Sequence, residues 1–543
     1  MEPAMNRLLM RLALLVATLA ALSSPARAAL DPALVAGFAG DFSSRISAIE
    51  ALGVDGSEDA RRVVNALEAG NLGVAADKVV ILDGETVRDA ASGEALEIAL
   101  ADVDAITVNN RVRRSIATAN AAFELVSPDA ATRLASANVL IENASEALLP
   151  LFERTLASEQ DEAVRSVISR AAARINLSSA DAAKRLKAVE ALGESSDPAV
   201  KNMLAALLEK QGEGKQATWV EPDARVRAAA ESAISAIDGR IATAQTIGTV
   251  FSGLSLGSIL LLAALGLAIT YGVMGIINMA HGELLMVGAY ATFMVQGLFR
   301  NYLPAYVDWY VVAAVPAAFF AAALVGIAME RLVLRHLYGR PLESLLATWG
   351  LSLVLIQAAR VIFGPQNLEL ANPSWMSGGI ELAAGVVLPF NRIVIIGFAG
   401  FVLVLIWLMM QKTRLGMFVR AVTQNRPMAG CVGVPTARVD TLAFAIGSGV
   451  AGLGGLALSQ IANVGPAMGT GYIVDAFMVV VLGGVGQLAG AVWAALGLGI
   501  VAKFLEGWAG AVIAKILVLV FIIIFIQKRP QGIFALKGRF ADS

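Results

Sequence analysis

The sequence predicts an all-α protein: a polytopic membrane bundle of eight to ten helices, preceded by an exported, mainly helical domain. Three observations predict this class. Of 543 residues, 57% are hydrophobic and 16% are charged, whereas soluble domains are less apolar and more charged. The composition changes near residue 245, because residues 1–244 hold 25 Lys and Arg against 34 Asp and Glu, and residues 245–543 hold 17 against 10. Apolar stretches of membrane-spanning length recur in the second part.

Residues 1–28 have the features of a secretory signal peptide. Arg7 and Arg11 precede an apolar run over residues 12–22, and Ala26-Arg27-Ala28 is a small-x-small cleavage site. The run is too short to cross a hydrocarbon core of about 30 Å as a helix, so cleavage is favoured over an uncleaved anchor. Residues 29–245 are then expected outside the cytoplasm.

Residues 29–245 predict a domain of helical repeats. Ile46–Gly53 and Leu186–Gly193 share one pattern of small and apolar residues. Asp161, Asp197 and Asp223 each precede a helical segment whose first buried residue follows three positions later, as expected for N-caps. The pattern favours HEAT-like repeats, with a plain helical bundle as the alternative.

A small β-hairpin is expected within this helical domain. In Lys78–Arg88, β-branched residues flank Asp83-Gly84, a strong signal for a tight turn between two strands. We therefore expect a β insertion, and nothing in residues 29–245 indicates catalysis.

Residues 246–543 predict the membrane domain. Two short Gly-rich segments lie between residues 473 and 503, and glycines there indicate either close helix packing or a broken helix beside a cavity. The longer candidate spans are residues 250–271, 281–299, 309–329, 344–363, 391–410, 441–461 and 511–527.

Charge placement predicts the orientation of these spans. The loop over residues 363–390 has no Lys or Arg and is expected outside, while cation-rich loops are expected in the cytoplasm. An odd number of spans, such as the nine candidates, places the first domain outside and the C-terminus inside. The expected cytoplasmic cations are Arg331, Arg335, Arg340, Lys412, Arg414, Arg420, Arg426, Arg438, Lys528, Arg529, Lys537 and Arg539.

Cysteine and histidine are too scarce for several kinds of site. Cys431 is the only cysteine, and His281 and His336 are the only histidines. The counts exclude the usual zinc sites, iron–sulfur clusters and an intrachain disulfide, and we expect no catalytic residue, metal site or directly bound cofactor. Cations of the second part lie between apolar spans, so nucleic acid is not an expected partner.

Polar residues at membrane depth mark a candidate solute pathway. Asn278 and His281 are three residues apart and share a face if the segment is helical, and intramembrane ionisable groups indicate function. Helix capping is the alternative for Asn278 and for Asp475, and Glu283 then lies near a positive helix end. The candidate pathway residues are Tyr271, Asn278, His281, Glu283, Asp475, Gly483, Gly484 and Gly486.

The segment over residues 413–433 alternates helix-forming and helix-breaking residues and carries cations on a short amphipathic face. A partner protein is one expected ligand. Anionic lipid headgroups held by the arginines are the alternative.

Four motifs resemble the branched-chain amino-acid permease family of ABC importers. They are Tyr271–Phe293, Thr413–Gly433, Val480–Gln487 and Arg529–Phe534, and the likeness covers residues 250–540. Within that family, an exported helical domain ahead of the permease is similar to the urea-transporter permease subunit.

The resemblance implies a permease subunit in the bacterial inner membrane. It implies a second, homologous permease, two cytoplasmic ATPases and a periplasmic substrate-binding protein as partners, with ATP used by those ATPases. The chain is then no enzyme, and it has no phosphate-binding loop of the P-loop type. By the same resemblance, the ATPase-coupling residues are Arg414, Gly416, Arg420, Ala421, Asn425, Arg426, Ala429 and Gly433.

The expected function is ATP-driven uptake of urea or short amides by alternating access, with branched-chain or polar amino acids as the alternative substrates. Urea has no net charge, so polar uncharged partners such as Asn278 suit it. A secondary transporter or passive channel is the alternative of another class, and it needs more ionisable groups than Glu283 and Asp475 offer. The exported domain is expected to dock a partner, with the substrate-binding protein as the candidate.

Overall fold

A computed structural model describes residues 30–75, 78–84, 86–212, 218–383, 385–484, 486–529 and 532–534. The predicted signal peptide, residues 1–28, lies outside these ranges. The chain divides into two compact units, Met1–Asp238 and Gly239–Ser543, while helix α11 runs without a break from Ala224 to Met274. The division therefore falls within the residues of α11.

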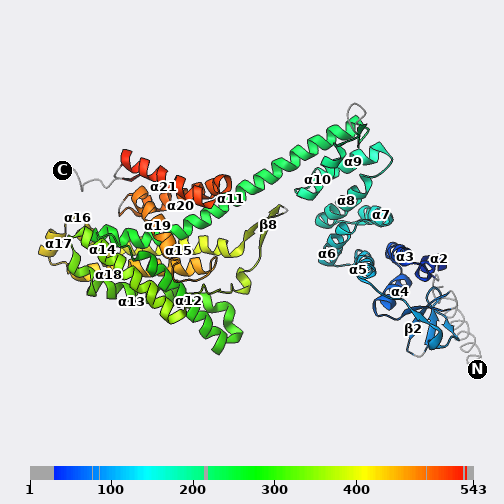
Figure 1. The fold of residues 1–543 in the computed structure, drawn as a ribbon, viewed down its shortest axis with the longest axis horizontal. Coiled ribbons are helices and arrows are strands. Elements are labelled where there is room, and N and C mark those ends of the chain that lie inside the picture. Colours follow the sequence, from blue (N-terminus) through cyan, green and yellow to red (C-terminus); the bar gives the residue numbers. More distant parts are fainter. Residues whose placement is uncertain are drawn as a thin grey trace, which may run out of the picture. The chain divides into compact units, whose positions relative to one another are not determined.

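The first unit is built mainly from helices that follow one another along the chain (Figure 1). Helix α5 packs on α6, α6 on α8, and α8 on α9. Its helices are α2 (Pro32–Ala36), η1 (Gly37–Ala39), α3 (Phe42–Asp55), α4 (Glu58–Glu68), η2 (Leu100–Asp102), α5 (Asn110–Glu124), α6 (Ala130–Glu142), η3 (Glu146–Leu148), α7 (Leu149–Ser158), α8 (Glu162–Asn176), α9 (Ala182–Leu192), α10 (Pro198–Leu207) and the start of α11.

Aspartate side chains begin the helices where the sequence predicts them. Asp161 Oδ1 accepts hydrogen bonds from the backbone N–H groups of Ala163 and Val164 at 3.0 and 3.1 Å. Asp197 and Asp223 accept equivalent bonds at 2.8 Å. Each cap satisfies N–H groups that have no partner inside the helix.

Two arginine–glutamate pairs repeat one bonding pattern. The guanidinium of Arg133 donates two hydrogen bonds to the carboxylate of Glu159 at 2.8 and 2.9 Å, and Arg185 donates two to Glu221 at 2.7 and 2.8 Å. Each arginine also donates to a backbone carbonyl that precedes its own helix: Arg133 to that of Ser127, and Arg185 to that of Ser179. The pattern joins the start of α6 to the turn before α8, and the start of α9 to the turn before α11. It is a repeated feature of this unit, and the HEAT-like class stays a prediction.

These pairs predict a pH dependence of folding stability. Hydrogen bonds from Arg133 and Arg185 hold the pKa values of Glu159 and Glu221 below the ordinary value of 4.5. A carboxylate with a lowered pKa in the folded state stabilises the fold fully above its unfolded pKa, and the contribution is lost as pH falls through the folded pKa. We expect Glu221→Gln to cost about 2 kcal/mol at neutral pH, and less below the ordinary glutamate pKa.

The measurement is urea unfolding followed by hydrogen-exchange mass spectrometry of residues 182–238 in the full chain, with wild type and variant compared at each pH. Asp238→Asn is the matched control, since its partner Lys201 lies 2.6 Å away but both side chains are exposed. That change should cost less than about 1 kcal/mol. A cost for Glu221→Gln that is independent of pH would contradict the assignment.

The predicted hairpin is confirmed and belongs to a larger sheet. Strands β2 and β3 pair with Asp83 opposite Thr86, and Gly84 adopts φ 62° in the turn. The antiparallel sheet has the order β4-β3-β2-β1-β5. Its strands are β1 (Leu72–Ala75), β2 (Lys78–Asp83), β3 (Thr86–Asp89), β4 (Ala95–Leu96) and β5 (Asp104–Ala105), and β6 (Lys210–Gln211) pairs with β7 (Thr218–Trp219) elsewhere in the unit.

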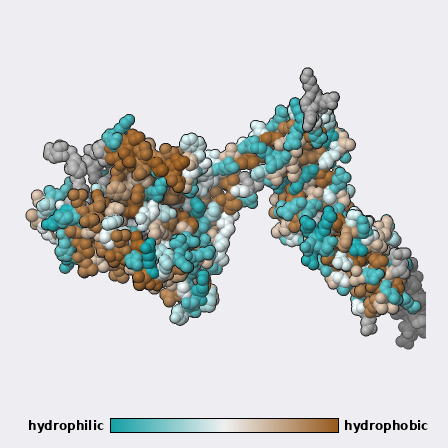
Figure 2. Space-filling view, in the orientation of Figure 1, coloured by the Kyte–Doolittle hydropathy of each residue, from teal (hydrophilic) through white to brown (hydrophobic). Residues whose placement is uncertain are grey.

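The second unit confirms the predicted helix bundle. Among the described residues, eight helices are long and apolar enough to cross a membrane, and α19 is a shorter apolar helix. The face in Figure 2 is broadly hydrophobic over this unit. Its elements after α11 are α12 (His281–Tyr302), η5 (Pro304–Trp309), α13 (Tyr310–Leu332), η6 (Leu334–Leu337), α14 (Pro341–Phe363), η7 (Ser374–Met376), β8 (Gly379–Ala383), β9 (Val386–Pro389), α15 (Phe390–Lys412), α16 (Arg414–Gln424), α17 (Arg426–Cys431), α18 (Thr436–Ser459), α19 (Thr470–Gly483), α20 (Leu488–Ala509) and α21 (Ala511–Lys528).

Helix α18 forms the centre of this bundle. In the most apolar 18-residue stretch of α18, 89% is buried, whereas the corresponding share is 17% for α14 and for α21. Helix α18 is therefore surrounded by protein, while the other two present most of their surface outward. Glycines let α12 approach α18 closely: Gly288 lies against Gly452, and Gly455 lies against the backbone of Leu285. Small residues at such crossings are typical of membrane helix packing.

Candidate functional site

The link between α11 and α12 places Asn278 and His281 differently from the prediction. Helix α11 ends at Met274, and Gly275 adopts φ 66°, so Asn278 lies in a non-helical segment and does not share a helix face with His281. The Oδ1 atom of Asn278 accepts a hydrogen bond from the N–H of Ala280 at 3.0 Å. This bond lies before α12, whose N-cap residue is Ala280 without a side-chain bond, so Asn278 does not cap the helix. Its Nδ2 atom is buried without a hydrogen bond among the described residues.

His281 and Glu283 fasten the start of α12 to two neighbours. The Nε2 atom of His281 lies 2.9 Å from the carbonyl oxygen of Ala263 in α11, and the ring is fully buried. Glu283 is 2% exposed and accepts a hydrogen bond of 3.4 Å from the hydroxyl of Thr470 at the start of α19. Its Oε2 atom has no partner within the described part of the chain. These groups offer hydrogen bonds to a polar solute, and the described part of the chain contains no group of side chains that could hold a metal ion.

Tyr271 lies near the C-terminal end of α11 and is half-buried. Its ring lies 6.4 Å from the ring of Phe477, centroid to centroid. The contact packs α11 against α19.

Asp475 forms an ion pair and does not cap its helix. Its Oδ2 atom lies 3.1 Å from the ammonium of Lys515 in α21, and Lys515 also donates to the carbonyl of Gly471 at 3.0 Å. Helix α19 has Gly469 as its N-cap, without a side-chain bond, so the capping alternative is wrong for Asp475. Asp475, Lys515 and Glu506 line a cleft of about 130 Å³ whose other walls are apolar. Lys515 was not predicted as a candidate, because its partner Asp475 is in another helix.

The glycines at the end of α19 favour the close-packing alternative. Gly484 and Gly486 adopt φ 98° and 76°, and Gly483 packs against Gly490. The tail motif closes this turn, because the N–H of Ile533 donates to the carbonyl of Leu482 at 2.8 Å. Close packing therefore favours glycine at 483 and 490, and the positive φ favours glycine at 484 and 486.

The candidate pathway residues thus lie at the end of α11, around the start of α12, and along and just after α19. Asn278, His281 and Glu283 lie around the start of α12. Asp475 and the turn at Gly483 are eight residues apart on α19, about 12 Å along the helix axis.

The predicted coupling segment forms two short helices, α16 and α17. Thr413 caps α16 through the N–H of Gly416 at 3.3 Å, and Asn425 caps α17 through the N–H of Met428 at 3.0 Å. Gly416 packs against the backbone of Met410. The fold of this segment is therefore specified locally.

The remaining coupling candidates divide into anchoring and exposed residues. Arg420 donates to the carbonyl of Met410 at 2.6 Å, and Arg426 forms an ion pair with Asp440 of α18. Ala429 is buried and Ala421 half-buried, while Arg414 and Gly433 are exposed, the latter at φ 87°. Three apolar side chains in this segment are also exposed: Met417 (52%), Met428 (60%) and Val432 (71%). None of the three was among the predicted coupling residues.

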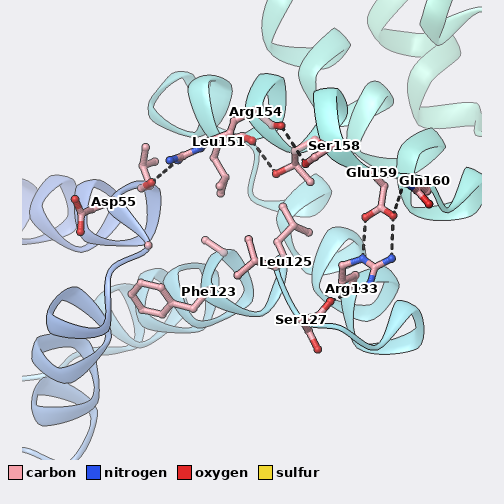
Figure 3. Close-up of a pocket in the computed structure, with 15 residues that line it drawn as sticks. Asp55, Phe123, Leu125, Ser127, Arg133, Leu151, Arg154, Ser158, Glu159 and Gln160 are labelled. Carbon is pink, nitrogen blue, oxygen red and sulfur yellow. Dashed lines mark hydrogen bonds and ion pairs between the residues drawn. The ribbon is translucent and has the colours of Figure 1, made fainter. Parts of the chain in front are cut away.

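The first unit contains a cleft of about 490 Å³ between α3, α5 and α7. Figure 3 shows Arg133 and Glu159 facing each other at one side, Asp55 and Arg154 at the other, and Leu125 and Leu151 between. Val126, on its rim, is 73% exposed. Both arginines are hydrogen-bonded: Arg133 donates to Glu159, and Arg154 donates to the carbonyl of Val54 at 2.7 Å.

Comparisons with known proteins concern the second unit. Residues 249–526 match the family described as branched-chain amino acid transport system / permease component. The high-affinity branched-chain amino acid transport system permease protein BraD of Pseudomonas aeruginosa is 30% identical over 288 residues, which cover 52% of this chain and 93% of that protein.

Two further relatives are more distant. The permease protein LivH of the same kind of transport system in Salmonella typhimurium is 28% identical, over 52% of this chain and 94% of that protein. The ribose import permease protein RbsC of Escherichia coli is 26% identical, over 45% and 71%. No solved structure matches significantly.

Proposed function

The chain belongs to the branched-chain amino acid transport permease family, and we propose that it is a permease subunit of an ATP-driven importer. The observation that carries the proposal is the pair α16 and α17, two capped helices that present Met417, Met428 and Val432 to solvent. Exposed apolar groups of this kind mark protein interfaces. The partners are two cytoplasmic ATPases, a second permease and an external substrate-binding protein, with ATP bound by the ATPases.

We propose branched-chain amino acids as the first candidate substrates, because the names of BraD and LivH state them. Urea or a short amide is the second candidate. It is favoured by Asn278, whose buried carboxamide nitrogen has no hydrogen bond among the described residues and can donate to a neutral carbonyl. It is also favoured by the pairing of Asp475 with Lys515, whose charges compensate each other.

Uptake into proteoliposomes that contain this chain and all its partners tests the proposal. Labelled leucine and labelled urea are offered outside, with and without ATP at the ATPase side. Uptake that requires ATP and is competed by the unlabelled form of only one solute identifies the substrate. Equal uptake without ATP would instead indicate the rival function, a passive channel or secondary transporter.

The unique cysteine gives a test of the proposed orientation, in which α16 and α17 face the cytoplasm. Cys431 is exposed at the end of α17. A membrane-impermeant maleimide is therefore expected to label it in inverted inner-membrane vesicles and not in intact spheroplasts, as read by mass shift. In a Cys431→Ser background, Val126→Cys is expected to show the reverse, since the first unit is proposed to be periplasmic. Labelling of Cys431 from outside would reverse the topology.

We further propose that the first unit docks the substrate-binding protein at the cleft beside Val126. The cleft combines an exposed apolar rim with polar groups from Ser127, Ser158 and Gln160, the mixture typical of reversible protein interfaces. Val126→Glu should weaken binding-protein affinity, measured by surface plasmon resonance on the reconstituted complex. Unchanged affinity after this change, and after deletion of residues 29–240 in a properly inserted chain, would exclude the docking role.

A further inference from the structure

An ion pair fastens the proposed coupling segment to the most buried helix of the bundle. Arg426 begins α17, and its guanidinium contacts the carboxylate of Asp440 in the first turns of α18. The Arg426 side chain is 38% exposed, whereas that of Asp440 is 1% exposed. The link therefore runs from a surface helix to a buried anchor.

The surroundings of the pair hold the arginine in place. The Cζ atom of Arg426 lies 4.6 Å from the ring centroid of Tyr338, which follows η6, a cation–π arrangement that adds to the ion pair. A buried carboxylate without a partner is strongly disfavoured, so Asp440 resists any movement of α17 that would withdraw Arg426. The Oδ1 atom of Asp440 is already without a hydrogen bond among the described residues.

Asp440 also lies beside a second connection into the bundle. Its neighbour Thr441 donates a hydrogen bond of 2.8 Å to Glu330, near the end of α13. Glu330 is 1% exposed. Helix α18 packs along both α12 and α13, and α12 begins with His281 and Glu283. A displacement of α17 would therefore move α18, and through the buried contacts of α18 it would also move α13 and the start of α12 at His281 and Glu283.

A helix of six residues cannot hold its own position in solution. The contacts that fix α17 include its Asn425 cap, the buried methyl group of Ala429, the ring of Tyr338 against Arg426 and the charged link to Asp440. Of these, only the last reaches a charge in a spanning helix.

We propose that the Arg426–Asp440 pair is a latch that transmits ATPase movement from α17 to α18, and that Arg426 is a positioning residue for transport. The inference rests on the proposed importer function. The proposal separates two properties. Docking of the ATPases depends on the exposed face of α16 and α17, whereas the coupling of transport to ATP hydrolysis depends on the latch behind that face.

The test compares solute moved per ATP hydrolysed in proteoliposomes of the full complex, with labelled leucine and labelled urea as probes. Arg426→Gln and Asp440→Asn are expected to assemble and hydrolyse ATP, while the ratio of transport to hydrolysis falls about tenfold, within the usual range of coupling energies. Arg426→Lys keeps the charge and should recover part of the ratio. Arg340→Gln is the control, because its pair with Glu343 is exposed on both sides, and its ratio should be that of wild type.

Each other result has a definite meaning. An assembled Arg426→Gln complex with the wild-type ratio overturns the latch while leaving the importer function intact. Failure of all three latch variants to assemble overturns it too, in favour of a purely structural pair. Absence of ATP-dependent uptake in wild type with active ATPases overturns the proposed function, and the latch with it.

Discussion

Replacing Gly455 with alanine is expected to prevent the second unit from folding stably, although the change adds one methyl group. A Cβ atom at this position would lie 2.7 Å from the carbonyl carbon of Leu285, and closer still to its oxygen. Those atoms belong to the backbone of α12, so no side-chain rotation relieves the contact. Helix α12 or α18 must move, and overpacking of this kind costs about 3 kcal/mol, a large part of the stability of an ordinary fold.

Gly400→Ala in α15 is the matched control. The added methyl group there meets nothing within 4 Å, so the intrinsic preference of alanine for helices is expected to leave stability unchanged or raise it by up to about 1 kcal/mol. The two changes are chemically identical and differ only in their surroundings. Thermal unfolding in detergent, with size-exclusion chromatography as the check on aggregation, should give a lower midpoint for Gly455→Ala and an unchanged or higher midpoint for Gly400→Ala. Equal midpoints would show that α12 and α18 are not packed as described.

The spanning helices could be predicted from the sequence because each requires a long apolar stretch, and length alone separates such stretches from loops. Helix caps were predictable for a similar reason. Asp161 and the hairpin turn at Gly84 act over two or three residues, so their signal is local. The short strands β1 and β5 were not predicted, because they are strands only through pairing with β2 and with each other.

The site was less predictable than the fold. The predicted common face of Asn278 and His281 required a helix, but α11 ends at Met274 and Gly275 follows with a positive φ. Glycine just after a helix is a stop signal that sequence alone can provide. Lys515 and Asp440 were missed because their partners lie 40 and 14 residues away on other helices. Spacing along one chain segment gives no information about such contacts.

Introducing a charge on the exposed face of α17 is expected to abolish uptake without harming the fold. Met428→Glu and Val432→Glu each place a carboxylate at a side chain that is more than half exposed, so the free chain tolerates it. At an ATPase interface the same carboxylate would be buried without a partner, which costs about 3 kcal/mol and weakens association roughly a hundredfold. The measurement is co-purification of the ATPases with the tagged permease, together with ATP-dependent uptake.

Tyr306→Glu provides the control for an added charge. Tyr306 is 60% exposed in η5, which precedes α13, whereas Tyr338 beside Arg426 follows α13. One spanning helix therefore separates the two positions, and ATPase co-purification should survive this change.

The same variants decide between the two ligands expected for residues 413–433. If the segment held anionic lipid headgroups through its arginines, added carboxylates at Met428 or Val432 would weaken vesicle binding only modestly by repulsion, and the ATPases would still co-purify. Arg414→Gln, which removes an exposed cation, would then be at least as damaging. In a protein interface centred on apolar side chains the order is reversed, because the buried carboxylate costs more than a lost surface charge. The ranking of these variants therefore identifies the ligand, whatever the absolute affinity.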